Sequence, residues 1–152
     1  MIQLFTELQE KKNVRSNLSA LRASLKEATE EQKAQAIEFV RGHEDLVFGF
    51  LQEEDAKTRK NAALLLGDLA VQNALQPLWK AYTREQTLFV KSAYLEAMKA
   101  LHAEEILSQL KDRLAELEGE PVTEENRKHR EAELRALRAI LIQYCLLYTS
   151  DA

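Results

Sequence analysis

The sequence repeats itself with a shift of 32 residues between Asp55 and Leu114. The segment DAKTRKNAALLLGDLAVQNALQPLWKAY aligns with TLFVKSAYLEAMKALHAEEILSQLKDRL, so that Leu66 falls on Met98 and Leu78 on Leu110. A period of this length, with apolar positions kept in register, is typical of helical hairpins that stack on their neighbours. The repeat therefore predicts a stacked architecture rather than one closed core.

Weaker copies of the same pattern lie on both sides. A shift of 29 places Ala34, Ile37 and Val40 on apolar positions of the central hairpin, and we expect these three side chains to be buried. A shift of 40 extends the apolar pattern forward to a last helix, whose inner positions are Leu134, Leu137 and Leu141. About nine helices joined by short turns follow from this reading.

Composition and capping signals favour an all-α fold. Glycine and proline are scarce, at four and two residues, which leaves little turn chemistry for a β-protein. The run Thr29 to Gln32 has the pattern of a capping box, and Thr83 to Gln86 repeats it. Asp55 is placed to cap the helix that we expect at 56–70.

The central repeat resembles a known family. The residues that carry the resemblance are Thr58-Arg59-x-x-Ala62-Ala63-x-Leu65-Leu66-Gly67-x-Leu69, followed by Ala74-Leu75-x-Pro77-Leu78. They resemble HEAT-like repeats of the phycobilisome-lyase type, which implies a short α-solenoid of stacked HEAT-like helical hairpins over 1–144. The resemblance also implies a ladder that includes Asp55 and Arg59. Thr87 and Lys91 depart from the pattern, so the ladder is expected to be incomplete.

The whole stretch, with its ELRALRAIL helix, also resembles the HEAT-like leader of certain bacterial THUMP-type RNA methyltransferases. This second resemblance implies a catalytic domain elsewhere, since no methyltransferase motif is present here. Residues 145–152, CLLYTSDA, resemble a translated sequencing adaptor. We interpret them as a non-native tail and residues 1–144 as the N-terminal fragment of a longer protein.

No motif for catalysis or for a cofactor is found. The glycines are scattered, so there is no phosphate-binding loop, and His43, His102 and His129 lie far apart, so a metal site is not expected. No apolar run approaches the roughly 20 residues of a membrane span, and the first residues lack a secretory leader. We expect a cytoplasmic protein without a membrane partner.

Basic residues on the repeated helices mark the candidate binding surface. Neighbouring helices would align them as a stripe that follows a phosphate backbone, although ordinary solvated helix faces give the same pattern. The net charge of −4 and the lack of interleaved aromatic residues favour a protein partner over RNA. The candidate residues are Lys57, Arg59, Lys60, Leu64, Lys80, Arg84, Lys91, Glu96 and Lys99.

Two functions follow as the main hypotheses, and a third, a lyase-like helper that binds a cofactor or chromophore, is the weakest because nothing in the sequence marks a pocket. The first is a non-catalytic protein-interaction scaffold, whose partner is another protein or the missing C-terminal domain of the same chain. The alternative is an RNA-binding accessory domain of an RNA (tRNA or rRNA) methyltransferase, gripping RNA through the basic stripe. We expect no enzymatic activity in these residues and no cofactor.

Overall fold

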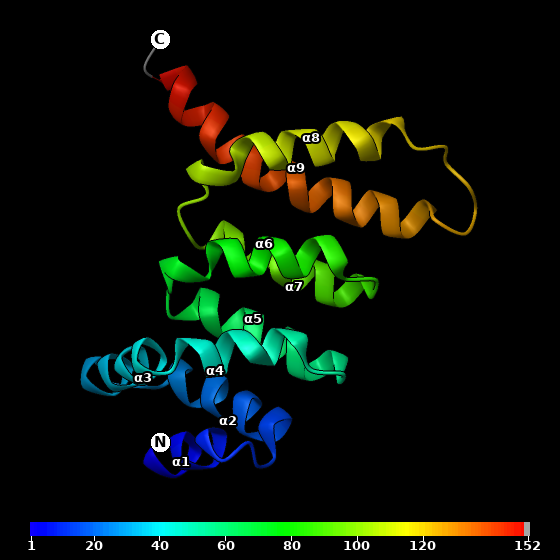
Figure 1. The fold of residues 1–152 in the computed structure, drawn as a ribbon. Helices are drawn as coiled ribbons and strands as arrows, with labels where there is room; N and C mark the ends of the chain where they lie inside the picture. The colour runs from blue at the N-terminus through cyan, green and yellow to red at the C-terminus, as the bar shows by residue number, and fades with distance from the viewer. Residues whose placement is uncertain (151–152) are drawn as a thin grey trace. The chain divides into compact units, whose positions relative to one another are not determined.

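The computed structural model describes the backbone of residues 1–150 and the side chains of residues 1–144. Within this part the regular structure is entirely helical, with nine α-helices and three short 3₁₀ helices (Figure 1). The predicted all-α fold is therefore confirmed. The tail predicted at 145–152 lies outside the described side chains.

The chain divides into two compact units, Met1–Leu101 and His102–Ala152. The first unit contains α1 (Ile2–Gln9), α2 (Val14–Lys26), α3 (Glu30–Gly42), α4 (Glu44–Gly49), α5 (Ala56–Asp68), α6 (Leu75–Arg84) and α7 (Leu88–Lys99), with 3₁₀ helices at Phe50–Gln52 and Gln72–Ala74. The second contains a 3₁₀ helix at Glu104–Ile106, then α8 (Leu107–Gly119) and α9 (Arg127–Ser150).

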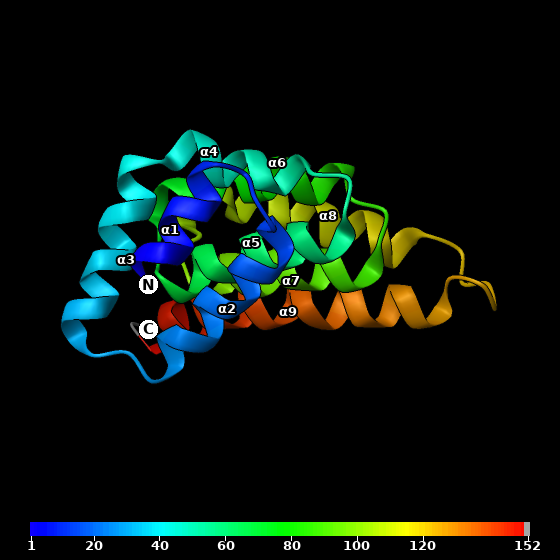
Figure 2. The same ribbon diagram turned by 90° about the horizontal axis from the view of Figure 1, so that it is seen from below.

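In the first unit, α5 lies between α2 and α7 (Figure 1). The helix α6 packs on α7, and α1 packs on α2. The helix α3 packs on α4 and runs crosswise to α2 and α5 (Figure 2). The layer of α2, α5 and α7 is thus continuous, and α3 is set apart from it.

The duplicated hairpin supplies the core, as predicted. Leu66, Leu78 and Met98 are fully buried, and both α5 and α7 contribute buried alanines and leucines to the core of the first unit. In the second unit, Leu110 of α8 packs in a core with the buried leucines of α9, Leu134, Leu137 and Leu141. The apolar positions aligned by the shifts of 32 and 40 residues therefore face the interior of their units.

Of the three positions in the weaker N-terminal copy that were expected to be buried, only Val40 is fully buried. Ala34 is exposed and Ile37 is half-buried, whereas Ala36 and Val40 are buried. The crosswise direction of α3 explains the difference, because the helix turns a different stripe toward its neighbours than a stacked helix would.

Two of the three capping predictions are confirmed. The hydroxyl of Thr29 accepts from the Gln32 N–H at 3.1 Å and the Gln32 side chain accepts from the Thr29 N–H at 3.0 Å, which is a complete capping box. Asp55 accepts from the Thr58 N–H at 2.9 Å. The box at Thr83 is wrong, because Thr83 lies inside α6 and its hydroxyl donates to the Lys80 carbonyl at 2.7 Å.

Gly67 allows α5 and α7 to approach closely. A Cβ built on Gly67 would lie 2.9 Å from the Cα of Ala97 and 3.2 Å from its Cβ. The nearest obstacle is backbone, which cannot rotate away as a flexible side chain would. Only glycine fits this helix crossing without moving α7.

We expect Gly67→Ala to lower the free energy of unfolding by about 1–2 kcal/mol. Overpacking costs about 1–3 kcal/mol, and the higher helix propensity of alanine returns up to about 1 kcal/mol. Urea titration followed by far-UV circular dichroism measures the change. Gly49→Ala is the matched control, since a Cβ there meets nothing within 4 Å and should stabilise. Equal effects at both positions would contradict the close approach.

Candidate functional site

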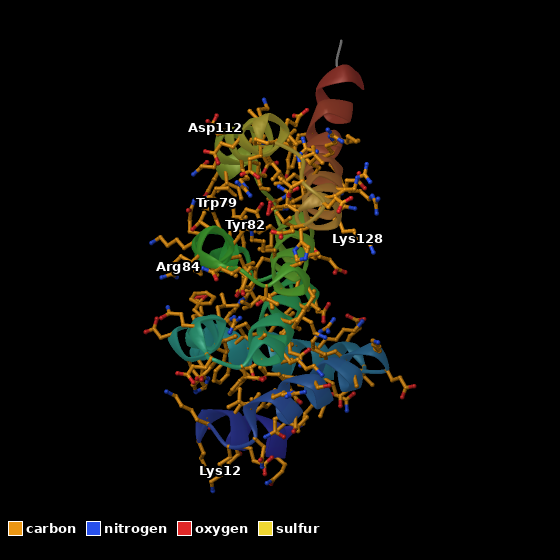
Figure 3. All side chains as sticks on the ribbon, turned by 90° about the vertical axis from the view of Figure 1, so that its right-hand side faces the viewer. Lys12, Trp79, Tyr82, Arg84, Asp112 and Lys128 are labelled. Carbon is orange, nitrogen blue, oxygen red and sulfur yellow. The ribbon has the colours of Figure 1, made fainter. Side chains whose placement is uncertain are left out.

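The candidate surface residues lie on three helices of the first unit. Lys57, Arg59, Lys60 and Leu64 are on α5, Lys80 and Arg84 on α6, and Lys91, Glu96 and Lys99 on α7. Lys57, Lys80, Arg84, Glu96 and Lys99 are exposed, and the other four are half-buried. Figure 3 shows Arg84 at the outer side of α6. The structure brings the α5 and α7 residues onto adjacent helices.

Arg59 is engaged inside the protein rather than offered to a ligand. Its Nε and Nη2 donate to the two carboxylate oxygens of Glu85, each at 2.9 Å. Its Nη1 donates to the backbone carbonyls of Glu53 and Glu54 at 2.8 Å. A two-pronged pair of this kind is the strong form of the arginine–carboxylate interaction. The predicted basic stripe is therefore interrupted at its centre.

Lys91, the repeat counterpart of Arg59, has a different environment. Its ammonium group lies over the ring of Tyr82, 5.8 Å from the ring centroid. This geometry is that of a cation–π contact, which stabilises by about 0.5–1 kcal/mol at a partly exposed site. Lys91 thus also takes part in packing α7 against α6.

Glu85 is the centre of a polar cluster in the turn between α6 and α7. Besides Arg59, it accepts from the Thr87 N–H at 3.2 Å and from the Tyr94 hydroxyl at 3.1 Å. Burial alone would raise the pKa of Glu85, but the hydrogen bonds from Arg59, Thr87 and Tyr94 outweigh it and hold the pKa below its ordinary value. Burial also raises the pKa of the Tyr94 hydroxyl, so Tyr94 stays a neutral donor.

Glu85 is not among the site residues predicted from the sequence. A signal existed, because Glu85 is the repeat counterpart of Glu53 and precedes by two residues the position expected to hold the acid of the ladder. The ladder position itself holds Thr87, and the longer glutamate side chain reaches Arg59 from two residues earlier.

Asp55 and Arg59 do not pair with each other. Asp55 lies 3.5 Å from Arg15 of α2, and Arg59 of α5 pairs with Glu85, which precedes α7. In both pairs an arginine on one helix of the layer contacts an acid ahead of the next helix. The hydrogen bond from the Thr58 hydroxyl, joined by the Thr58 N–H and by Arg15, lowers the pKa of Asp55 although burial opposes the shift.

A groove lies between α3 and the helices α2 and α5. It is lined by the end of α2, the middle of α3 and the end of α5, and its volume is about 460 Å³. We call it the α2–α3–α5 groove. Its lining residues are Arg22, Leu25, Lys26, Lys33, Ile37, Asp68, Leu69 and Ala70.

The end of α5 in this groove has an unusual backbone. Ala70 has a positive φ of 51°, the left-handed region that normally favours glycine. Its N–H donates to the Gly67 carbonyl, and the Val71 N–H donates to the Leu66 carbonyl, both at 3.0 Å. This pair of bonds is the Schellman motif, which ends a helix and turns the chain sharply. The turn presents Leu69 and Ala70 to the groove.

Ala70→Gly is expected to raise the free energy of unfolding by about 0.5–1 kcal/mol. Relief of the left-handed strain, worth about 1–2 kcal/mol, exceeds the added entropy of glycine in the unfolded chain, about 0.4–1 kcal/mol. The same urea titration measures it. Ala100→Gly, at a right-handed position with φ −75° after α7, should instead destabilise. Destabilisation at both positions would show that Ala70 is not strained.

Two other hollows are less suited to a partner. One, of about 480 Å³, adjoins the Glu85 cluster, where the charged groups Arg59 and Glu85 already satisfy each other. The other, of about 720 Å³, lies along α8 and α9 in the second unit and mixes Glu118 and Glu131 with three arginines. Arg130 there donates to the Leu117 and Glu118 carbonyls at 3.1 Å and caps α8.

The second unit has a buried ion pair of its own. Nη2 of Arg113 on α8 lies 2.8 Å from a carboxylate oxygen of Glu133 on α9, and the Glu133 side chain is buried. The Tyr144 hydroxyl accepts from the Ala103 N–H at 2.6 Å. The first contact joins α8 to α9, and the second joins α9 to the segment ahead of α8.

Neither a metal site nor a membrane span is found in the part of the chain that the structure describes. No three His, Cys, Asp or Glu side chains gather there as metal ligands, and no helix is long and apolar enough to cross a bilayer. Of the three histidines, His43 contacts Gln9 and the Phe39 carbonyl and stacks on the Phe39 ring. His43 therefore packs α3 on α1.

In comparisons with known proteins, no family model, no curated protein and no solved structure matches this chain.

Proposed function

We propose that this protein is a non-catalytic interaction scaffold, a short α-solenoid of stacked HEAT-like helical hairpins, which binds a segment of a protein partner in the α2–α3–α5 groove. The observation that carries the proposal is the groove itself, an open hollow of about 460 Å³ with Leu25, Ile37 and Leu69 in its lining. Hollows with an apolar lining and a few placed polar groups are the usual form of a binding site.

The layer of α2, α5 and α7 supports the solenoid part of the proposal. Each helix packs on the next, and the ion pairs Arg15–Asp55 and Arg59–Glu85 connect successive helices in the same sense. This repeated relation corresponds to the ladder that the family resemblance implies, with Glu85 in place of the expected residue at Thr87. A surface held in this way loses little entropy when a partner binds.

The RNA-binding alternative has less support. Its basic stripe needs Arg59, which is occupied by Glu85 and by two backbone carbonyls. The chain also carries a net charge of −4, which opposes the long-range attraction that nucleic-acid binding relies on. We therefore propose a protein partner, in keeping with a cytoplasmic scaffold that needs no cofactor.

A selection of random peptides displayed on phage tests the proposal. The peptides that the wild-type protein enriches should lose binding to Ile37→Arg, because the new side chain fills the groove with a charge. Leu64→Arg is the matched control, as Leu64 is also half-buried but lies on α5 outside the groove lining. It should leave binding unchanged.

Two outcomes would overturn the proposal. Enrichment of no peptide would contradict a scaffold that binds protein segments. Loss of binding in Leu64→Arg but not in Ile37→Arg would place the site on the α5–α7 surface instead of the groove. Circular dichroism of both variants shows whether each is folded before binding is compared.

A further inference from the structure

We infer that the α2–α3–α5 groove takes an acidic protein segment with at least one large apolar side chain. This inference rests on the proposed function and adds the chemical class of the partner. It follows from the charges around the groove and from its apolar floor. It also follows from the ion pair in which Asp68 already neutralises Arg22.

The rim of the groove is basic. Arg22 and Lys26 reach it from α2 and Lys33 from α3, whereas Asp68 is the one carboxylate among its described lining residues. Three cations therefore face one anion, in a chain whose net charge is −4. Charge complementarity of this kind selects the partner and speeds its association.

The cations differ in how far they are neutralised. The Nε atom of Arg22 lies 2.8 Å from a carboxylate oxygen of Asp68, and the two side chains are 24% and 40% exposed. Lys33 lies 3.7 Å from Glu30, whose side chain is 96% exposed and is therefore well screened by water. Lys26 is exposed at the last turn of α2. Lys26 and Lys33 are thus the groups best placed to meet a partner's carboxylates.

The floor of the groove is apolar. Leu25 and Leu69 are 8% and 7% exposed, and Ile37 beside them is half-buried. Together with Ala70 they form a surface that an apolar side chain would cover, with a gain proportional to the area removed from water. A partner that offered only charged groups would leave these apolar side chains in contact with water. The partner therefore needs both an acidic and an apolar component.

Asp68 already places a carboxylate in the lining of the groove. It holds Arg22 at 2.8 Å, and its negative charge repels an incoming carboxylate. Replacing it with asparagine removes the repulsion and releases the charge of Arg22 toward the partner. The acidic class of the partner thus predicts an unusual result, namely that loss of an ion pair of the free protein strengthens binding.

The experiment uses a phage library with equal shares of acidic and basic residues at random positions. Peptides that bind wild type but not Ile37→Arg should be enriched in Asp and Glu together with Leu, Ile or Phe. A selected peptide, labelled for fluorescence anisotropy, is then titrated with Lys26→Glu/Lys33→Glu and with Asp68→Asn. We expect Kd to rise about tenfold in the first variant and to fall about threefold in the second.

The matched control is Lys111→Glu/Lys128→Glu, which makes the same change in charge at exposed positions of α8 and α9, outside the groove lining. It should leave Kd within about twofold. Enrichment of neutral or basic peptides at the groove, or a weaker Kd in Asp68→Asn, would overturn the acidic partner while leaving the scaffold in place. If no groove-dependent peptide appears, the proposed function itself fails.

Two further measurements exclude other occupants of the same groove. A single-stranded RNA that competes with the selected peptide, and that loses affinity in Lys26→Glu/Lys33→Glu, would overturn a protein partner in favour of a polyanion. Sedimentation that shows a dimer disrupted by Ile37→Arg would assign the groove to a second copy of the chain.

Discussion

Replacement of Glu85 by alanine should destabilise the first unit by about 3–5 kcal/mol. The carboxylate accepts from Arg59, Tyr94 and the Thr87 N–H, and its side chain is only 6% exposed. Removing one partner of a buried ion pair leaves the other charge in a poorly solvated place, which costs far more than the pair itself contributes. Trp79, the only tryptophan in the sequence, reports unfolding of this unit by fluorescence in urea.

The control for this prediction removes the same carboxylate group at a different position. Glu53→Ala removes an exposed carboxylate that is the repeat counterpart of Glu85, and it should change the free energy of unfolding by less than about 0.5 kcal/mol. The double variant Arg59→Met/Glu85→Met should be more stable than Glu85→Ala, because it leaves no buried charge. Its loss of unfolding free energy should also be smaller than the sum of the losses in the two single methionine variants. Strict additivity would contradict a coupled pair.

The same pair makes stability depend on pH. The pKa of Glu85 is lowered in the folded protein, so the unfolded chain binds the proton more readily. Its contribution is therefore complete above the ordinary glutamate pKa of about 4.3 and is lost as the pH falls through the lower, folded value. The difference in stability between wild type and Glu85→Ala should shrink below about pH 4 and stay constant from about pH 6 to 8.

Leu66→Ala should lower the free energy of unfolding by about 2–5 kcal/mol. Leu66 is fully buried on α5, the helix that lies between α2 and α7, so the cavity forms where packing is closed on both sides. Urea titration with Trp79 fluorescence measures the loss. Leu64→Ala, two residues earlier and half-buried, is the matched control and should cost about 1 kcal/mol or less.

A small effect at Leu66 would have a clear meaning. A loss below about 1 kcal/mol would show that the apolar register of the repeat is wrong, since a fully buried leucine cannot be truncated so cheaply. A loss at Leu64 as large as that at Leu66 would show that the outer face of α5 is covered in solution, and would point to a partner on that face.

Much of the fold could be predicted from the sequence. The register of the duplicated hairpin, the caps at Thr29 and Asp55 and the buried leucines of α9 depend on local periodicity and on residues three or four apart. These features are set by neighbours along the chain, and a single sequence contains those neighbours in full.

The errors occur where a distant contact competes with a local pattern. Thr83 has the residues of a capping box, yet α6 continues past it and Glu85 leaves the helix to meet Arg59, which lies 26 residues earlier. Ala34 has the right spacing for burial, yet the crosswise path of α3 turns Ala36 inward instead. At Thr83 the hydrogen bonds of Glu85 outweigh a capping signal worth about 1 kcal/mol, and at Ala34 the packing direction of α3 decides which face is buried.

The candidate site divides in the same way. The amino-acid order alone determined that the chain is all-α, that its central hairpin is repeated and that basic residues recur on the repeated helices. Only the tertiary structure decided that Arg59 is occupied by Glu85, and that Arg22, Lys33 and Asp68 line one groove. The reason is physical: periodicity specifies which face of a helix is buried, whereas the packing angle of α3 specifies which side chains from separate helices converge.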